Sequence, residues 1–173
     1  MDLSFRPGGP DDAPALVRVL VEGFETYREW MPPTWSPKID LNEREYERLA
    51  RRLGDDEVWC RVAESAGEAV GYVTLTPAYT REEPRELIPG LAHIWHIFVS
   101  PRWWGSGVAP RLMAEATEEA VARGYSHARL WTPRDNTRAR AFYEREGWRA
   151  SGAERYAEDL DIDLVEYRRA LPG

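Results

Sequence analysis

One segment constrains the fold more than any other part of the 173-residue chain. Residues 91–99 read as a strand, residues 107–123 place apolar side chains at helical spacing, and residues 126–132 read as a strand again. A strand, a helix and a second strand in this order build a parallel pair joined by a right-handed crossover. The sequence therefore predicts a sheet that holds at least one parallel pair.

The remaining elements follow from periodicity and from turn residues. Strands are expected over residues 3–6, 58–64 and 69–76 and twice within 148–171, helices over 13–27, 42–53 and 136–146, and a loop over 77–89. We predict an α/β fold of the α+β mixed kind, with a central mixed, mostly antiparallel sheet of about six to seven strands and about four flanking helices. The chain shows no repeat and no linker, so a single domain is expected over residues 1–173.

Charge and hydropathy limit the partners. The formal net charge of −7 argues against nucleic acid, because binding to a phosphate backbone requires a basic surface. It mildly favours a cationic substrate such as an amine. The first residues carry no apolar signal region, and no apolar run is long enough to span a membrane. A cytoplasmic protein without a membrane partner is therefore expected.

The turn inside the parallel unit is its most informative part. Gly105, Ser106 and Gly107 open the helix, where backbone N–H groups lack partners and the helix dipole is positive. Small residues allow a phosphate to approach this backbone. A Walker loop would require Gly-Lys-Ser/Thr, and a dinucleotide fingerprint would require glycine at Pro110, so both interpretations are disfavoured. A tight turn without a ligand remains open.

A second segment, residues 136–148, adds weight to a phosphate site. It reads Asn-Thr-Arg-Ala-Arg-Ala-Phe-Tyr-Glu-Arg-Glu-Gly-Trp and follows the turn by one strand. Together the two segments resemble the GNAT N-acetyltransferase superfamily, which has a Gln/Arg-x-x-Gly-x-Gly/Ala turn and then an Asn-x-x-Ala-x-x-Phe/Leu-Tyr-x-x-x-Gly-Phe/Trp segment. The order of elements matches along nearly the whole chain, which implies a GNAT-like fold. One departure is Trp104, which stands at the Gln/Arg position.

The resemblance implies that acetyl-CoA is the acyl donor. The turn would hold its pyrophosphate, strand 91–99 would contact the pantetheine arm through its backbone, and Tyr143 would protonate the departing sulfur. The cofactor-binding candidates are Phe98, Val99, Trp104, Gly105, Ser106, Gly107, Val108, Ala109, Asn136, Arg138 and Tyr143. Arg111 and Arg140 are further candidates for a CoA phosphate, with exposed surface arginines as the alternative.

A general base is expected on strand 91–99. Strict alternation would put His93 and Trp95 on one face and His96 on the other. His93 stands where the resembling family often carries a glutamate, and histidine titrates near neutral pH, so His93 is the first catalytic candidate and His96 the second. A histidine that only packs or hydrogen-bonds is the alternative for each.

Four aromatic residues are candidates for the acceptor pocket, because the loop between the first two helices covers that site in the resembling family. They are Tyr27, Trp30, Trp35 and Trp95, with ordinary core packing as the alternative. No metal is expected in the reaction.

These residues predict direct transfer of the acetyl group from acetyl-CoA to a primary amine of a small-molecule or peptide acceptor. A backbone N–H of strand 91–99 is the expected donor to the oxyanion. A catalytically silent CoA-binding sensor or partner module on the same fold is the alternative. The identity of the acceptor, the length of the acyl chain and the presence of a homodimer remain open.

Overall fold

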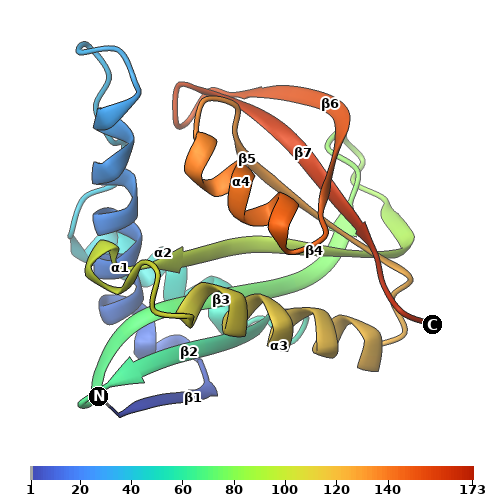
Figure 1. The fold of residues 1–173 in the computed structure, drawn as a ribbon, viewed down its shortest axis with the longest axis horizontal. Helices are drawn as coiled ribbons and strands as arrows, with labels where there is room; N and C mark the ends of the chain where they lie inside the picture. The colour runs from blue at the N-terminus through green and yellow to red at the C-terminus, as the bar shows by residue number, and fades with distance from the viewer. Residues whose placement is uncertain (1) are drawn as a thin grey trace.

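The computed structural model describes residues 2–173, and only Met1 of the predicted domain lies outside them (Figure 1). The strands are β1 (Leu3–Pro7), β2 (Trp59–Ser65), β3 (Glu68–Tyr79), β4 (Leu87–Val99), β5 (His127–Pro133), β6 (Arg149–Ala157) and β7 (Ile162–Ala170). The α-helices are α1 (Ala13–Glu25), α2 (Glu43–Leu53), α3 (Val108–Ala122) and α4 (Thr137–Arg145). Short 3₁₀ turns cover Pro10–Asp12, Thr26–Glu29 and Pro101–Trp103. No helix among these residues is long and apolar enough to cross a membrane.

The strands form one sheet in the order β1-β2-β3-β4-β5-β7-β6. Every neighbouring pair is antiparallel except β4 and β5, which the α3 crossover makes parallel. The prediction of a mixed, mostly antiparallel sheet is confirmed, with seven strands and four α-helices within residues 2–173. α1 and α2 pack on one face, whereas α3 and α4 pack on the other.

The parallel pair is short, and this divides the sheet. Residues Leu91 to Ile94 of β4 pair with His127 to Leu130 of β5, and no pairing between the two strands follows within the described chain. β4 nevertheless continues to Val99, and β5 continues beside β7 to Pro133. The two strands therefore diverge toward their carboxyl ends, in Figure 1 above the start of α3.

A β-bulge at Trp95 corrects the predicted faces of β4. The register with β3 shifts by one residue there, so Trp95 has no counterpart in the ladder. The prediction that His93 and His96 lie on opposite faces is wrong, because the extra residue turns both toward the face covered by α1 and α2. Ile94 and Ile97 lie on the α3 face instead.

Two predicted boundaries also differ from the structure. The expected loop 77–89 is shorter, because β3 extends to Tyr79 and β4 begins at Leu87. Proline lacks an N–H group, but the ladder tolerates Pro77 at a second register shift. The first helix ends at Glu25 and continues as the 3₁₀ turn Thr26–Glu29.

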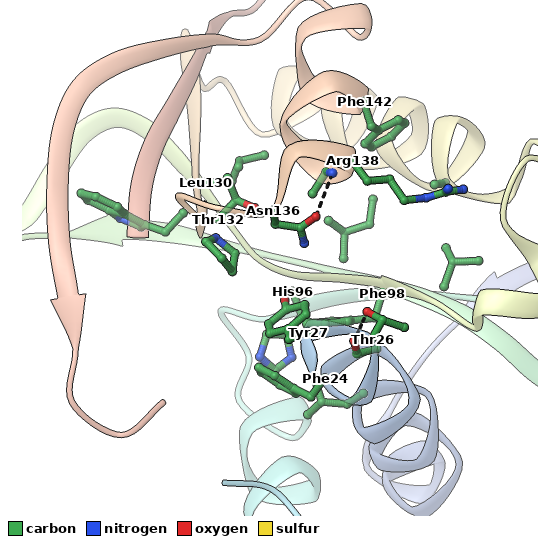
Figure 2. A pocket seen from close by; sticks show the side chains of 18 of the residues that line it. Phe24, Thr26, Tyr27, His96, Phe98, Leu130, Thr132, Asn136, Arg138 and Phe142 are labelled. Carbon is green, nitrogen blue, oxygen red and sulfur yellow. Dashed lines mark hydrogen bonds between the residues drawn. The ribbon is translucent and has the colours of Figure 1, made fainter. Parts of the chain in front are cut away.

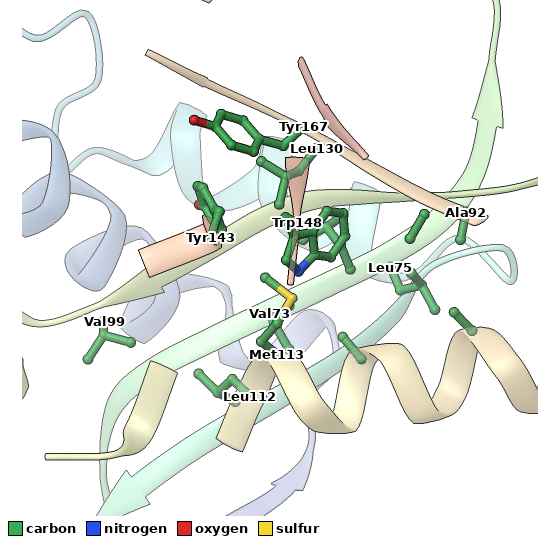
Figure 3. Close-up of a cluster of buried hydrophobic side chains, with 14 of the residues drawn as sticks. Val73, Leu75, Ala92, Val99, Leu112, Met113, Leu130, Tyr143, Trp148 and Tyr167 are labelled. Atoms are coloured by element: carbon green, nitrogen blue, oxygen red, sulfur yellow. The ribbon is translucent and has the colours of Figure 1, made fainter. Parts of the chain in front are cut away.

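Trp148 lies at the centre of the larger core, between the sheet, α3 and α4. Figure 3 shows its ring near Tyr143 and Leu130 and close to Met113 of α3. A glycine C-cap brings it there: Gly147 adopts φ 87°, its N–H donates to the carbonyl of Glu144, and the Trp148 N–H donates to the carbonyl of Tyr143 at 2.9 Å. The end of α4 thus fixes both aromatic residues against each other.

Candidate active site

A cavity of about 940 Å³ occupies the region where β4 and β5 diverge (Figure 2). Its wall continues from the α3–α4 face to the α1–α2 face, with β4 between them. Figure 2 shows Asn136 and Arg138 above β4 and Phe24 and Tyr27 below it. A single cavity can therefore admit two reactants from opposite faces of the sheet.

The start of α3 forms one end of this cavity. Gly105 and Gly107 have φ angles of 76° and 89°, which side chains rarely adopt, and a Cβ atom at either would meet nothing within 4 Å. Gly107 is the N-cap, and within residues 2–173 no side chain caps this end. The free backbone N–H groups and the positive helix end fit a phosphate that approaches closely.

The five consecutive cofactor-binding candidates from Gly105 to Ala109 do not all reach the cavity. Gly105, Gly107 and Ala109 line it, but Ser106 turns its hydroxyl back to donate to the carbonyl of Trp103. Val108 is buried in the core. Any contribution of Ser106 and Val108 to ligand binding would therefore come from their backbone.

Trp104 explains how the chain departs from the family pattern without losing the turn. Its indole N–H donates to the carbonyl of Val99 at 3.0 Å, which ties the turn to the end of β4. The guanidinium carbon of Arg138 lies 4.1 Å from the centroid of the Trp104 ring, a cation–π contact across the cavity wall. The pair places a positive charge beside the cradle.

The other two predicted phosphate-binding arginines are engaged elsewhere. Arg111 donates to the carboxylate of Glu115 at 2.7 Å. Arg140 donates to the hydroxyl of Tyr167 at 3.0 Å and to the carbonyl of Arg134 at 2.9 Å. Neither lines the cavity formed by the described residues, whereas Arg138 and Arg145 of α4 both do. Of these two, Arg138 contacts Trp104 beside the cradle and is the nearer candidate for a phosphate group.

Asn136 and Tyr143 belong to α4 and line the cavity. The Asn136 carboxamide oxygen accepts the Ala139 N–H at 3.1 Å and caps the helix. Tyr143 packs beside Trp148 with 7% of its surface exposed. Burial raises the pKa of Tyr143 above its ordinary value, although the side chain of Thr132 acts against this rise. The tyrosine is therefore protonated at neutral pH and able to donate.

His96 is held by a buried tyrosine. The Tyr72 hydroxyl lies within hydrogen-bond distance of its Nδ1, at 2.9 Å, and burial raises the pKa of Tyr72, so this hydroxyl keeps its proton. The Trp95 ring stacks on the imidazole with centroids 4.0 Å apart. Burial, aided by Arg48 and Arg52, lowers the pKa of His96 to about 3. His96 is thus neutral at pH 7.

His93 has a different environment. Burial lowers its pKa to about 3, and Arg129, Arg155 and His96 act in the same direction. Its buried Nδ1 has no hydrogen-bond partner among the described residues. His93 lines the cavity as His96 does, so the structure brings both catalytic candidates into one wall.

Three of the four predicted acceptor-site aromatics line the cavity, namely Tyr27, Trp30 and Trp95. Tyr27 and Trp30 pack together with ring centroids 4.8 Å apart. Trp35 does not line it, since its buried indole donates to the carbonyl of Leu160 at 3.0 Å and supports the wall from behind.

Sequence reasoning missed the part of the wall that comes from β5, β6 and the turn after β6. The missed residues include Trp131, Thr132, Arg155, Asp159 and Leu160. No spacing along the chain relates them to the two motifs, because they reach the cavity through the strand order β5-β7-β6.

The neutral state of His96 predicts a pH-dependent stability. In the unfolded chain a histidine binds a proton below about pH 6.5, whereas folded His96 stays neutral down to about pH 3. The unfolded state therefore binds more protons in this window, and the free energy of unfolding falls as the pH falls. Between pH 7 and pH 5, His96→Gln should therefore lose about 2 kcal/mol less unfolding free energy than the wild type. Urea denaturation at both pH values measures this difference.

The Gln oxygen can still accept the proton of Tyr72, which limits other damage in this variant. His127→Gln, at the exposed start of β5, is the matched control and should retain the wild-type pH dependence. If His96→Gln loses as much unfolding free energy between pH 7 and pH 5 as the wild type, then His96 binds a proton in the folded state as it does in the unfolded state.

Taken together, the divided sheet, the open N-terminus of α3 and the titratable groups in one cavity fit a transferase whose donor carries phosphate. Residues 21–148 match the family model described as Acetyltransferase (GNAT) family. An uncharacterized N-acetyltransferase of Archaeoglobus fulgidus is 32% identical over 141 residues, which cover 82% of this chain and 89% of that protein. The chain belongs to the GNAT acetyltransferase family.

Further likenesses agree with this membership. YhfO, an uncharacterized N-acetyltransferase of Bacillus subtilis, is 27% identical over 84% of this chain and 89% of that protein. The fold is also similar to that of the PaiA N-acetyltransferase from Thermoplasma acidophilum, solved in complex with coenzyme A. The TM-score is 0.70 at 17% identity, covering 98% of this chain and 99% of that one.

Proposed function

We propose that this enzyme transfers the acetyl group of acetyl-CoA to a primary amine by direct attack within the cavity between β4 and β5. The observation that carries the proposal is the continuity of one cavity from the α3 cradle, past Tyr143, to His93 and His96. A donor held at the cradle and an acceptor held on the α1–α2 face would then meet beside β4, without a covalent intermediate on the protein.

The donor end has defined roles in this proposal. The backbone at Gly105 and Gly107 would hold the pyrophosphate, and Arg138 would add a positive charge beside it. Acetyl-CoA supplies an activated thioester, so the protein needs mainly to orient the two reactants and to move protons. Tyr143, protonated and lining the cavity, is the proposed donor of a proton to the leaving sulfur.

The two histidines receive different roles. An amine attacks only after it loses its ammonium proton. His93 is the proposed base, acting directly or through a water molecule, because its Nδ1 has no partner in the part of the chain that the structure describes. Nδ1 of His96 is already hydrogen-bonded with Tyr72, so its proposed role is to contact polar groups in the cavity through Nε2.

The first experiment is calorimetric titration with acetyl-CoA, with NAD as the control, followed by a thiol-release assay over a panel of amines. Binding of acetyl-CoA together with amine-dependent thiol release supports the proposal. Binding without thiol release for any amine would point instead to a silent CoA-binding module, and no binding would reject both functions.

The cradle makes a separate prediction. Gly107→Val places a side chain where a phosphate would approach, so the Kd for acetyl-CoA should rise by about 30-fold, near 2 kcal/mol. Gly124→Val is the matched control, since Gly124 follows the other end of α3 with φ 84° and equally open space. Both variants carry similar backbone strain, and only Gly107→Val should lose binding. Equal affinities would mean that the phosphate binds elsewhere.

A further inference from the structure

Two arginines on the α1–α2 face of the sheet are at least half-buried and form no ion pair among the described residues. Arg129 of β5 is 9% exposed, and Arg155 of β6 is half-buried and lines the cavity. The Nε atoms of both are buried and lack a hydrogen-bond partner within residues 2–173. Glu166, the acidic neighbour of Arg129, is bonded to Arg168 at 2.8 Å. Arg129 donates from one Nη to the carbonyl of Tyr79 at 2.9 Å, and the unused donors that the structure shows are its Nε and the Nε of Arg155.

The local charge reinforces this pattern. Burial lowers the pKa of Arg129 and of Arg155, the positive charges of Arg168 and Arg81 lower the pKa of Arg129 further, and Arg129 lowers the pKa of Arg155. Arg81 and Arg85, in the loop between β3 and β4, act on Arg155 in the same direction, whereas Asp159 opposes them. A chain with a net charge of −7 therefore holds a positive cluster beside its cavity.

An unpaired guanidinium in a buried position costs free energy that a bound anion would recover. Arginine presents a planar set of donors that matches a carboxylate in two-point contact. Arg155 also lies over the Trp131 ring, with its guanidinium carbon 5.1 Å from the ring centroid, which holds the side chain against the cavity wall. Arg155 is therefore placed to receive a carboxylate from inside the cavity, whereas Arg129 does not line it within the described chain.

We propose that Arg155, supported by Arg129, binds a carboxylate of the acceptor, so that the acceptor is an amino acid or a short peptide with a free carboxylate. This inference rests on the proposed function, and it names the substrate class that the acetyltransferase site accepts. The local field near Arg155 is opposite to the overall charge of the chain, so a plain cationic amine is disfavoured at this end.

The position of His93 gives the carboxylate a second effect. His93 is paired with Arg129 across the parallel ladder, and Arg129, Arg155 and His96 are the charged or titratable groups that act on it. A carboxylate bound to Arg155 in the cavity offsets the positive charge around His93 and raises the pKa of His93. The acceptor would thus make the proposed base more effective when it binds.

The test compares matched acceptors in the thiol-release assay with acetyl-CoA. The panel contains α-amino acids, ω-amino acids and dipeptides, each with its carboxamide. For the wild-type enzyme, we expect kcat/KM to favour the carboxylate by on the order of 10- to 100-fold. Arg155→Met, which keeps an unbranched apolar side chain near Trp131, should bring that ratio close to one.

Arg149→Met is the matched control, because Arg149 lies on the same strand, is exposed and does not line the cavity within the described chain. It should keep the wild-type ratio. Carboxamides or plain amines that react as well as carboxylates in the wild type would overturn the inference and leave the acetyltransferase proposal intact. If Arg155→Met leaves the ratio of kcat/KM for carboxylates over carboxamides unchanged, the inference is likewise overturned.

A binding measurement separates the two proposals if no acceptor releases thiol, a result that counts against the proposed function itself. Calorimetry of the CoA complex with N-acetyl amino acids and their carboxamides then tests the anion site alone. Tighter binding of the carboxylates, lost in Arg155→Met, supports the site. Equal affinities would reject it.

Discussion

The Tyr143→Phe variant is expected to lose about 10²-fold in kcat while its Kd for acetyl-CoA stays nearly unchanged. The phenol is buried, and its raised pKa keeps the proton at neutral pH, so the hydroxyl can donate to a leaving thiolate. Phenylalanine fills the same space beside Trp148 and removes only that hydroxyl. Single-turnover kinetics with acetyl-CoA and calorimetry with CoA would separate chemistry from binding.

Tyr167→Phe is the matched control for this loss. Tyr167 is also a buried tyrosine, its ring centroid lies 5.8 Å from that of Tyr143, and it does not line the cavity among the described residues. Its hydroxyl donates to the carboxylate of Glu144 and accepts from Arg140, so its removal should lower stability with little effect on kcat. Wild-type turnover in Tyr143→Phe would remove Tyr143 from the mechanism.

The Trp148→Ala variant is expected to lose about 3–5 kcal/mol of unfolding free energy. Trp148 is 1% exposed and is the largest fully buried side chain among the described residues. Its removal leaves a cavity between β-sheet, α3 and α4 and releases Tyr143 from its packing partner. Urea denaturation at pH 7 measures the loss, and activity at low temperature would show how far Tyr143 depends on this support.

The Trp148→Phe variant separates the effect of lost ring volume from the effect of the indole N–H. The indole Nε1 of Trp148 is buried without a hydrogen-bond partner among residues 2–173, so the fold already bears the cost of its desolvation. Phenylalanine removes this polar group and keeps part of the volume, and the expected cost is about 1–2 kcal/mol. A loss below about 1 kcal/mol for Trp148→Ala would mean that the core closes around the missing ring.

The candidate site was predictable where neighbours in sequence build it. Gly105 and Gly107 form a turn through their own backbone, and the α4 cap by Asn136 joins residues three positions apart. The resemblance of the second segment to the family pattern identified Tyr143, which packs on the inner face of α4. These features depend on contacts within one or two turns of chain, which is the range over which spacing carries information.

The errors occur where a partner strand decides the geometry. The face of His93 relative to His96 changed because β3 imposes a bulge at Trp95, and a bulge exists only in relation to the strand opposite it. Trp35 appeared equivalent to Trp30 in sequence, but a carbonyl 125 residues away holds its indole outside the cavity wall.

Periodicity, caps and turn residues act between near neighbours. They were therefore enough to predict the succession of strands and helices along the chain, the parallel unit and the two local motifs. The separation of β4 and β5 after four paired residues is visible only in the tertiary structure. The same is true of the proximity of Arg129, Arg155 and His93 beside the resulting cavity. Those groups come from three strands, and their proximity depends on the sheet order and on the charges that packing leaves without partners.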